Sequence, residues 1–410
     1  MKRKTFFLSS LLAAALLLQP GLVSAAKAPT TAPKALAAAA AAQSSYPVPI
    51  PPEIAAKAYL LLDVSANGQV LAAKNADQPV EPASLTKLMT AYVVFDALKN
   101  KRLSLEQKLR VSEQAKNVEG SRMFVDVGWQ VPVEDLLKGL IVQSGNDAAH
   151  VLAEGVGGSV ANFVQMMNHQ AQRLGMTGTQ YKNAEGLTQD GHITTAHDLA
   201  LLAQRLMQDF PQYIGYYAIK HYRYPGTPLS NDTNRNTLLF RDPSVDGLKT
   251  GHTAAAGYCL VATAKREYAG VGPRRLISIV LGAASDNTRA AESQKLLNWG
   301  FVAYQPVKLF AAGNAVSEVP IYKGSRNTLA IGLPRDLIVA VPAGTAAQVT
   351  TALARPNPLL APVRKGQALG TLQISVAGRP YTQVPLQALQ DVPLAGWFGR
   401  SWDAVRLWIQ

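Results

Sequence analysis

Three short segments of the chain carry side chains that together could catalyse acyl transfer. They are Ser-Leu-Thr-Lys at 84–87, Ser-Gly-Asn at 144–146 and Lys-Thr-Gly at 249–251, in that order. A serine hydroxyl is a poor nucleophile until a neighbouring group takes its proton, and a buried lysine beside other cations can become a neutral amine that does so. We therefore predict an active-serine site in which Ser84 attacks and Lys87 accepts its proton.

The second and third segments supply groups that such a site needs around its substrate. Ser144 can relay a proton toward a leaving nitrogen, and Asn146 offers a donor and an acceptor to a peptide backbone. Lys249 can be the second cation beside Lys87. Each motif alone proves little, so the prediction depends on their order and on the elements that carry them.

The third segment also suits a strand that borders a substrate. Gly251 would let a substrate backbone approach closely, because glycine has no side chain. The Thr250 hydroxyl can bind a carboxylate. We expect both residues at the edge of the site.

A helix is expected to begin at Ser84 and to position the first segment. Pro82 and Ala83 precede it, and the run L-T-K-L-M-T-A-Y-V-V-F-D-A-L that follows is apolar with few polar breaks, which is typical of a helix buried on most sides. Ser84 and Lys87 are three residues apart and so share one face. Backbone N–H groups at this helix start, including that of Ser84, would face a developing oxyanion.

The surrounding pattern predicts an α+β domain with an antiparallel sheet and a helical lobe. A β-hairpin is expected from Ala58, since Asn67-Gly68 suits a tight type I′ turn. Other strands are expected at 246–253, 257–264 and 275–283, the last two joined by a loop with Gly270, Gly272 and Pro273. Further helices are expected at 133–143, 147–154, 195–207, with Thr195 as a cap, and 288–304.

The chain changes character near Gln305. Residues 306–390 read as short alternating strands separated by Gly, Pro and Asn, which predicts a small all-β domain. Residues 391–410 predict an amphipathic helix whose apolar side carries three tryptophans and whose polar side carries two arginines. We expect it to lie on an anionic membrane surface, with docking on the β domain as the alternative.

The N-terminus predicts export. Lys2, Arg3 and Lys4 precede an apolar run and the small residues at 23–25, so residues 1–25 read as a signal peptide and 26–48 as an Ala/Pro-rich linker. Removing residues 1–25 lowers the formal charge from +13 to +10. Such a surface favours envelope polyanions, and an exported chain rarely meets nucleic acid. We expect no nucleic-acid partner.

The cysteine and histidine content does not predict disulfide or metal chemistry. Cys259 is the only cysteine and lies in a strand-like run, so we expect a buried thiol. His192 and His197 are five residues apart, which is not the spacing of a helical zinc motif. We expect no metal and no organic cofactor.

The motifs resemble those of the penicillin-recognising serine enzymes, and more closely the low-molecular-mass penicillin-binding proteins that are D-alanyl-D-alanine carboxypeptidases. The matching runs are Q-S-G-N-D-A at 143–148, D-G-L-K-T-G-H-T at 246–253 and R-A-A-E-S-Q-K-L-L-N-W-G-F from 289. The resemblance runs from about Ala55 to the terminal helix. It implies a β-lactamase/transpeptidase-like domain at 49–305, followed by the small β domain and the helix.

The resemblance also implies roles for individual residues. It makes Ser84 the acylated nucleophile, and its oxyanion hole would use the backbone N–H groups of Ser84 and His252. Arg289 would orient the substrate's terminal carboxylate with Thr250, and Arg235 would lie near the site. The other residues that it places in the site are Lys87, Ser144, Asn146, Lys249 and Gly251.

Some of these positions have simpler readings. Arg289 could belong to a solvated helix face and Arg235 to a loop salt bridge, while His252 could supply only backbone and shape. Ser121 could line the cleft or cap a loop. Glu185 could assist deacylation, but we expect it to face solvent.

The activity implied by the resemblance is removal of the terminal D-alanine from peptidoglycan pentapeptides through an acyl-enzyme, with β-lactams acylating the same serine. The protein would act in cell-wall biogenesis and cell shape, attached peripherally to the periplasmic face of the cytoplasmic membrane. Two alternatives are a β-lactamase of related fold and a non-catalytic wall-binding scaffold. Against the first, the chain has Ser-Gly-Asn and no E-x-x-L-N element; against the second, the reactive residues are intact.

Overall fold

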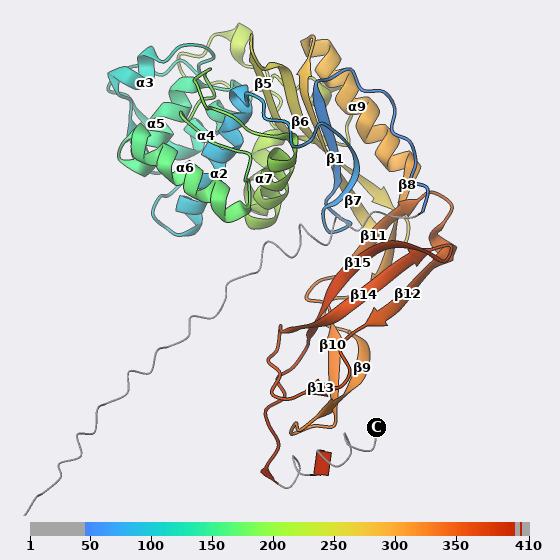
Figure 1. The fold of residues 1–410 in the computed structure, drawn as a ribbon. Helices are drawn as coiled ribbons and strands as arrows, with labels where there is room; N and C mark the ends of the chain where they lie inside the picture. The colour runs from blue at the N-terminus through green and yellow to red at the C-terminus, as the bar shows by residue number, and fades with distance from the viewer. Residues whose placement is uncertain (1–45, 398–401, 404–410) are drawn as a thin grey trace, which may run out of the picture. The chain divides into compact units, whose positions relative to one another are not determined.

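The computed structural model describes residues 46–397 and 402–403 (Figure 1). The expected signal peptide at 1–25 and nearly all of the expected linker at 26–48 lie outside the described residues. Most of the expected terminal helix at 391–410 also lies outside them. Within the described part of the chain, no helix is long and apolar enough to span a bilayer.

A five-stranded antiparallel sheet forms the centre of the first folded part. Its order is β2-β1-β7-β6-β5. The opening hairpin is confirmed, because Asn67 and Gly68 both have positive φ angles, 58° and 78°. The strands are β1 (Ala58–Asp63), β2 (Gln69–Lys74), β5 (Val245–Thr253), β6 (Gly257–Tyr268) and β7 (Gly272–Ala283). Gly272 and Pro273 thus begin β7 and do not belong to the loop.

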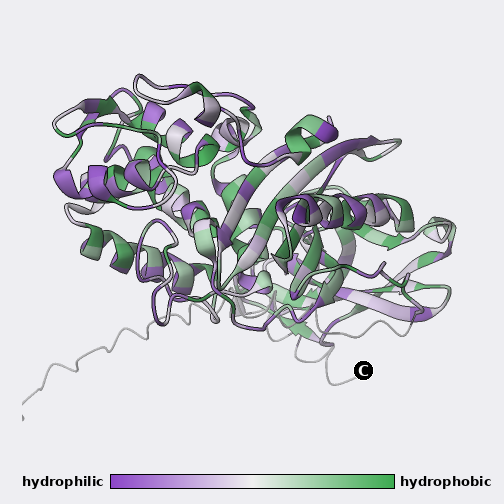
Figure 2. Cartoon of the chain, turned by 90° about the horizontal axis from the view of Figure 1, so that it is seen from above, coloured by the Kyte–Doolittle hydropathy of each residue, from purple (hydrophilic) through white to green (hydrophobic). Residues whose placement is uncertain are grey.

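Both faces of the sheet are covered. Along β1, Leu60 and Leu62 enter one core while Tyr59 and Leu61 enter another, since alternate side chains point to opposite faces of a strand. One core contains the helices that carry the site, and α9 (Asp286–Ala303) packs on the other face against β6 and β7 (Figure 1). Figure 2 shows that both the strands and the helices carry hydrophobic as well as hydrophilic residues.

The helical lobe contains the helices expected from the sequence and some that were not expected. A 3₁₀ turn, η1 (Ala83–Thr86), leads into α2, so Ser84 lies one turn before the α-helix. Thr195 caps α7 as expected, because its hydroxyl accepts the N–H of Asp198. The helices are α2 (Lys87–Lys99), α3 (Glu113–Asn117), α4 (Val133–Val142), α5 (Asn146–Gly157), α6 (Val160–Leu174), α7 (Ala196–Asp209) and α8 (Leu238–Arg241). The sequence analysis did not predict α3, α6 and α8, or the ribbon of β3 (Lys108–Arg110) and β4 (Gln130–Pro132).

A buried ion pair joins the sheet to the start of the β domain. Arg274 and Asp63 are both fully buried, and Arg274 Nε donates to Asp63 Oδ2 at 2.8 Å. Arg274 Nη1 also donates to the Tyr304 carbonyl at 2.7 Å. A buried charge is tolerated only when it is paired in this way, so the contact fixes β1, β7 and the following strand together.

The predicted small all-β domain is present. A six-stranded sheet of order β12-β14-β15-β10-β9-β13 and a two-stranded sheet of β11 and β8 enclose a separate apolar core. The strand β8 begins at Tyr304 and so crosses the expected boundary at 305/306. The strands are β8 (Tyr304–Phe310), β9 (Ala315–Tyr322), β10 (Thr328–Gly332), β11 (Leu337–Pro342), β12 (Val349–Ala354), β13 (Leu359–Leu360), β14 (Ala368–Val376) and β15 (Arg379–Ala388).

Candidate active site

Ser84 is presented by the 3₁₀ turn η1 at the start of α2. The preceding residue, Ala83, has a φ of 48°, a conformation that residues other than glycine rarely adopt. Two glycines allow other segments to approach this turn. A Cβ on Gly251 would lie 3.1 Å from Pro82 O, and one on Gly186 would lie 1.9 Å from Ala83 O. The strand β5 and the loop at 183–187 therefore hold the serine from two sides.

The amine of Lys87 is the centre of the site. Its Nζ lies 2.9 Å from Ser84 Oγ, 2.7 Å from Asn146 Oδ1 and 2.6 Å from the Glu185 carbonyl oxygen. A neutral amine has two N–H bonds and one lone pair. The amide and carbonyl oxygens can only accept, so they take the two N–H bonds and leave the lone pair for the Ser84 hydroxyl proton.

Burial makes the neutral amine accessible near neutral pH. The Lys87 side chain is 2% exposed, and its desolvation lowers the pKa of Lys87 from the ordinary 10.5 to about 7. The negative charges of Glu185 and Asp147 oppose this effect, while Arg235 adds to it. The geometry and the electrostatics both suit a base that removes the Ser84 proton.

Ser144 and Asn146 lie at the turn between α4 and α5. Ser144 has a φ of 59°, is 3% exposed, and its hydroxyl has no hydrogen-bond partner among the described residues. Asn146 Nδ2 donates to the Glu119 carbonyl, which directs its Oδ1 toward Lys87. The unpaired Ser144 hydroxyl is thus available to a substrate, and strain of this kind is common at functional sites.

Asp147, which the sequence analysis did not single out, holds the loop that follows Ser121. Its buried carboxylate accepts the backbone N–H groups of Met123 at 2.9 Å and Phe124 at 2.8 Å. Gly145 makes room for this contact, because a Cβ there would lie 2.8 Å from Asp147 Oδ1. The sequence shows only that an acid follows the second motif, and the burial that gives this acid its role depends on the tertiary fold.

The third segment lies on β5, as expected. Lys249 is 2% exposed and its Nζ donates to the Thr250 carbonyl at 2.9 Å. Burial, followed by the positive charge of Lys87, lowers the pKa of Lys249 well below its ordinary value. The positive charge of a protonated Lys87 thus disfavours a second proton on this buried amine.

A cavity of about 270 Å³ brings most of the predicted site residues together. Arg289 donates to the Gly251 carbonyl at 3.0 Å and pairs with Asp286, so its guanidinium is fixed at one end of the cavity. The lining residues are Ser84, Ser121, Ser144, Arg235, Thr250, Gly251, His252, Tyr258, Asp286 and Arg289. Lys87 and Asn146 join this set through their hydrogen bonds, and Lys249 through its strand.

The structure also tests the simpler roles that the sequence left open for Arg289, Arg235 and His252. Arg289 is 6% exposed and does not belong to a solvated helix face. Arg235 donates to the Gln143 carbonyl and to Asn231 Oδ1 and forms no salt bridge with any residue that the structure describes. The His252 ring stacks on Tyr258 with centroids 4.0 Å apart, a contact that pairing of β5 with β6 explains.

Two expectations about single residues have definite outcomes. Glu185 was expected to face solvent, and this is wrong: it is 4% exposed because the loop at 183–187 packs on η1. Cys259 is a free, buried thiol as expected, and burial raises its pKa. The sequence analysis missed Tyr258 and Asp286, although each lies within six residues of a predicted site residue.

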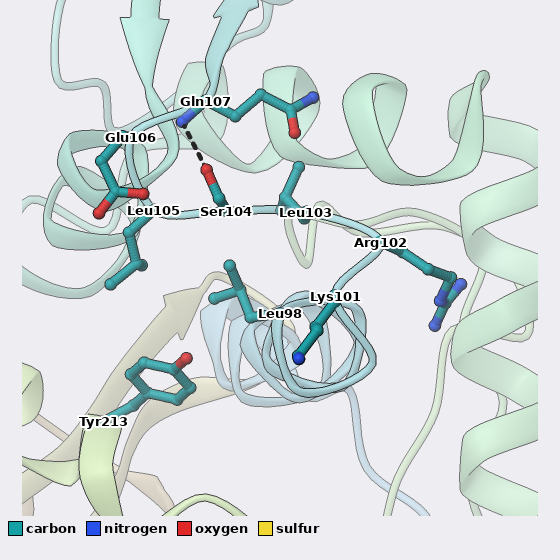
Figure 3. A pocket seen from close by; sticks show the side chains of 9 residues that line it. All are labelled: Leu98, Lys101, Arg102, Leu103, Ser104, Leu105, Glu106, Gln107 and Tyr213. Carbon is teal, nitrogen blue, oxygen red and sulfur yellow. Dashed lines mark hydrogen bonds between the residues drawn. The ribbon is translucent and has the colours of Figure 1, made fainter.

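A larger hollow of about 450 Å³ lies elsewhere on α2. Figure 3 shows it around Leu98, Lys101, Arg102 and Tyr213 at the C-terminal end of this helix. A helix of 13 residues is roughly 20 Å long, so this hollow is remote from Ser84. It contains none of the predicted site residues.

Comparisons with known proteins agree with this geometry. The family model described as D-alanyl-D-alanine carboxypeptidase matches residues 44–285, and that of the penicillin-binding protein 5 C-terminal domain matches residues 304–394. D-alanyl-D-alanine carboxypeptidase DacA of Haemophilus influenzae is 38% identical over 359 residues, 86% of this chain and 89% of the relative.

Solved structures show the same similarity. Penicillin binding protein 5 from Haemophilus influenzae matches with a TM-score of 0.79 and 36% identity, over 84% of this chain and 99% of that one. Penicillin-binding protein D2 from Listeria monocytogenes, in its cefotaxime-bound form, matches with a TM-score of 0.54 and 34% identity, over 62% of this chain and 100% of that one.

The packing of Gly186 on η1 generates a test of the site. Gly186→Ala places a Cβ against the Ala83 carbonyl, which is backbone and cannot move aside, so we expect Ser84 to be displaced and β-lactam acylation to slow at least about tenfold. Gly191→Ala is the matched control. It has a similar positive φ, and a Cβ there meets only the side-chain ends of Lys182 and Gln180, so it shares the backbone strain of about 1–3 kcal/mol without the backbone clash. Equal acylation rates in the two variants would show that the contact is unimportant.

Proposed function

The chain belongs to the D-alanyl-D-alanine carboxypeptidase family and is a serine-type D-alanyl-D-alanine carboxypeptidase, and on this premise we propose how its own residues perform the reaction. The observation that carries the proposal is the position of the Lys87 amine between Ser84, Asn146 and the Glu185 carbonyl. Its lone pair takes the Ser84 proton as Oγ bonds to the carbonyl carbon of the penultimate D-alanine.

Breakdown of the tetrahedral intermediate then releases D-alanine. The C–N bond breaks, the Lys87 ammonium gives up its proton, which reaches the leaving nitrogen through the Ser144 hydroxyl, and the acyl group stays on Ser84 as an ester. Backbone N–H groups of Ser84 and His252 stabilise the oxyanion. Water hydrolyses the ester, and Lys87 again accepts a proton and returns it to the Ser84 oxygen.

Arg289 and Thr250 orient the terminal carboxylate of the substrate. Arg289 is held by the Gly251 carbonyl and Asp286, so its charge has a fixed place in the cavity lining. A guanidinium can pair with a carboxylate through two parallel hydrogen bonds. Arg235 lines the same cavity and adds a second guanidinium charge to it.

The natural substrates are peptidoglycan stem peptides, and β-lactams acylate the same serine. The family assignment supports the first, and the cefotaxime-bound relative supports the second. Export by the sequence at 1–25 would bring the enzyme to the outer face of the cytoplasmic membrane, where these peptides lie.

Mass spectrometry after benzylpenicillin treatment tests the nucleophile. We expect one covalent adduct, on the peptide containing Ser84, and its complete loss in Ser84→Ala together with loss of D-alanine release from a D-Ala-D-Ala peptide. Cys259→Ser is the control, because it removes the only thiol and should keep the adduct. An adduct that survives in Ser84→Ala would exclude this serine.

We also propose that the C-terminal segment attaches the enzyme peripherally to an anionic membrane surface. The first residues of this segment are hydrogen-bonded to the β domain, because Ala395 N–H donates to the Lys323 carbonyl. Farther on, Trp397 and Trp402 are 68% and 67% exposed. Exposed tryptophans next to arginines suit a bilayer interface.

Truncation after Ala395 tests this attachment. It keeps the hydrogen bond from Ala395 N–H to the Lys323 carbonyl and removes the one from Lys323 N–H to Asp403. We expect the truncated enzyme to lose binding to vesicles that contain anionic phospholipid, with unchanged β-lactam acylation. Double replacement of Trp397 and Trp402 by alanine should weaken binding in the same direction. Vesicle binding that is identical in all three proteins would contradict the proposal.

A further inference from the structure

Glu185 links Lys87 to a histidine that the reaction scheme does not use. The Glu185 carbonyl accepts an N–H from Lys87, while its carboxylate Oε1 lies 3.1 Å from His150 Nδ1 on α5. Glu185 is 4% exposed, so its carboxylate needs a partner. One residue thus contacts the base through its backbone and the histidine through its side chain.

The contact continues from His150 toward the surface. His150 Nε2 lies 3.5 Å from Glu154 Oε1, one turn along α5, and Ser112 Oγ donates to the same oxygen at 3.0 Å. A hollow of about 480 Å³ is lined by Ser112, His150 and Glu154. His150 therefore joins the buried Glu185 carboxylate to a hollow that it lines together with Ser112 and Glu154.

The charges of Glu185 and His150 bear on the protonation of Lys87. The Glu185 carboxylate favours a proton on Lys87, in opposition to burial. Burial alone would lower the pKa of His150, but Glu185 and Glu154 raise it above the ordinary 6.5, which favours an imidazolium beside Glu185. A positive charge there offsets the carboxylate and weakens its pull on Lys87.

We propose that His150 and Glu185 are positioning residues for the Lys87 amine: the Glu185 carbonyl fixes its direction, and the His150 imidazolium offsets the carboxylate that would otherwise keep the amine protonated. The proposal rests on the function of Lys87 as the base for Ser84. Neither residue is part of the cavity lining.

Other charged groups face the same residues and remain in place when this pair is changed. Around Lys87 they are Asp147, Lys249 and Arg235. His192 lies on the other side of the Glu185 loop, where its ring contacts the Thr86 hydroxyl, and burial lowers its pKa to about 4. These groups set a constant background against which the pair can be measured.

The two residues have opposite effects on the pH dependence of acylation. Glu185→Gln removes the negative charge and keeps the backbone carbonyl, so Lys87 loses its proton at lower pH. His150→Gln leaves the Glu185 charge without its offset, so Lys87 keeps its proton to higher pH. A purely structural role would slow both variants without moving their pH profiles in opposite directions.

The experiment measures the second-order rate constant of acylation by a fluorescent penicillin between pH 5 and 9. In the wild-type enzyme this rate constant should rise with pH, with a midpoint at about pH 7. We expect the rising limb to move by roughly half a pH unit, down in Glu185→Gln and up in His150→Gln, which is about threefold in rate on the limb. The double variant should lie near wild type. Glu106→Gln, an exposed residue with the same charge change, is the control.

Limbs that stay together, or move in the same direction, would overturn the inference. Circular dichroism and thermal unfolding of each variant show whether a slow variant is folded. Failure of the inference is distinguishable from failure of the proposed function, because the Ser84 adduct in the wild-type enzyme is established separately.

Discussion

Burial of the Lys87 amine is the physical constraint on which the rest of the site depends. A buried ammonium group has lost its hydration, so burial lowers the pKa of Lys87. The protein replaces the lost water with hydrogen-bond acceptors. These acceptors come from the start of α5 and from the loop at 183–187, and the serine from η1. Three segments that are distant in sequence must therefore meet at one nitrogen atom.

The fold brings them together through small residues and buried polar contacts. Gly186 and Gly251 allow the loop and β5 to pack against η1, and Asp147 ties the loop after Ser121 to α5. The sheet behind the site is fixed by the Arg274–Asp63 pair. The β domain has its own core and contributes no residue to the cavity lining. The candidate active site and the proposed membrane attachment thus belong to separate parts of the chain.

The sequence predicted the elements well, because turn residues, caps and apolar periodicity act locally. Residues adjacent in sequence were enough to predict the Asn67-Gly68 hairpin, the Thr195 cap and the three strands around Lys249. The roles of Glu185 and Asp147 could not be predicted in this way, because they depend on which residues the tertiary fold buries. Glu185 looks like any loop acid until Gly186 places it beside Ala83, and α6 has an amphipathic pattern that was overlooked.

The most direct test of this account is the proton affinity of Lys87 itself. Protein carrying lysine labelled with ¹³C at Cε can be titrated by NMR, with the resonance assigned by its absence in Lys87→Met. The account predicts a midpoint near pH 7, as burial of the amine requires. An amine that stays protonated to its ordinary value of 10.5 would contradict it, because no neutral base would then be present to activate Ser84.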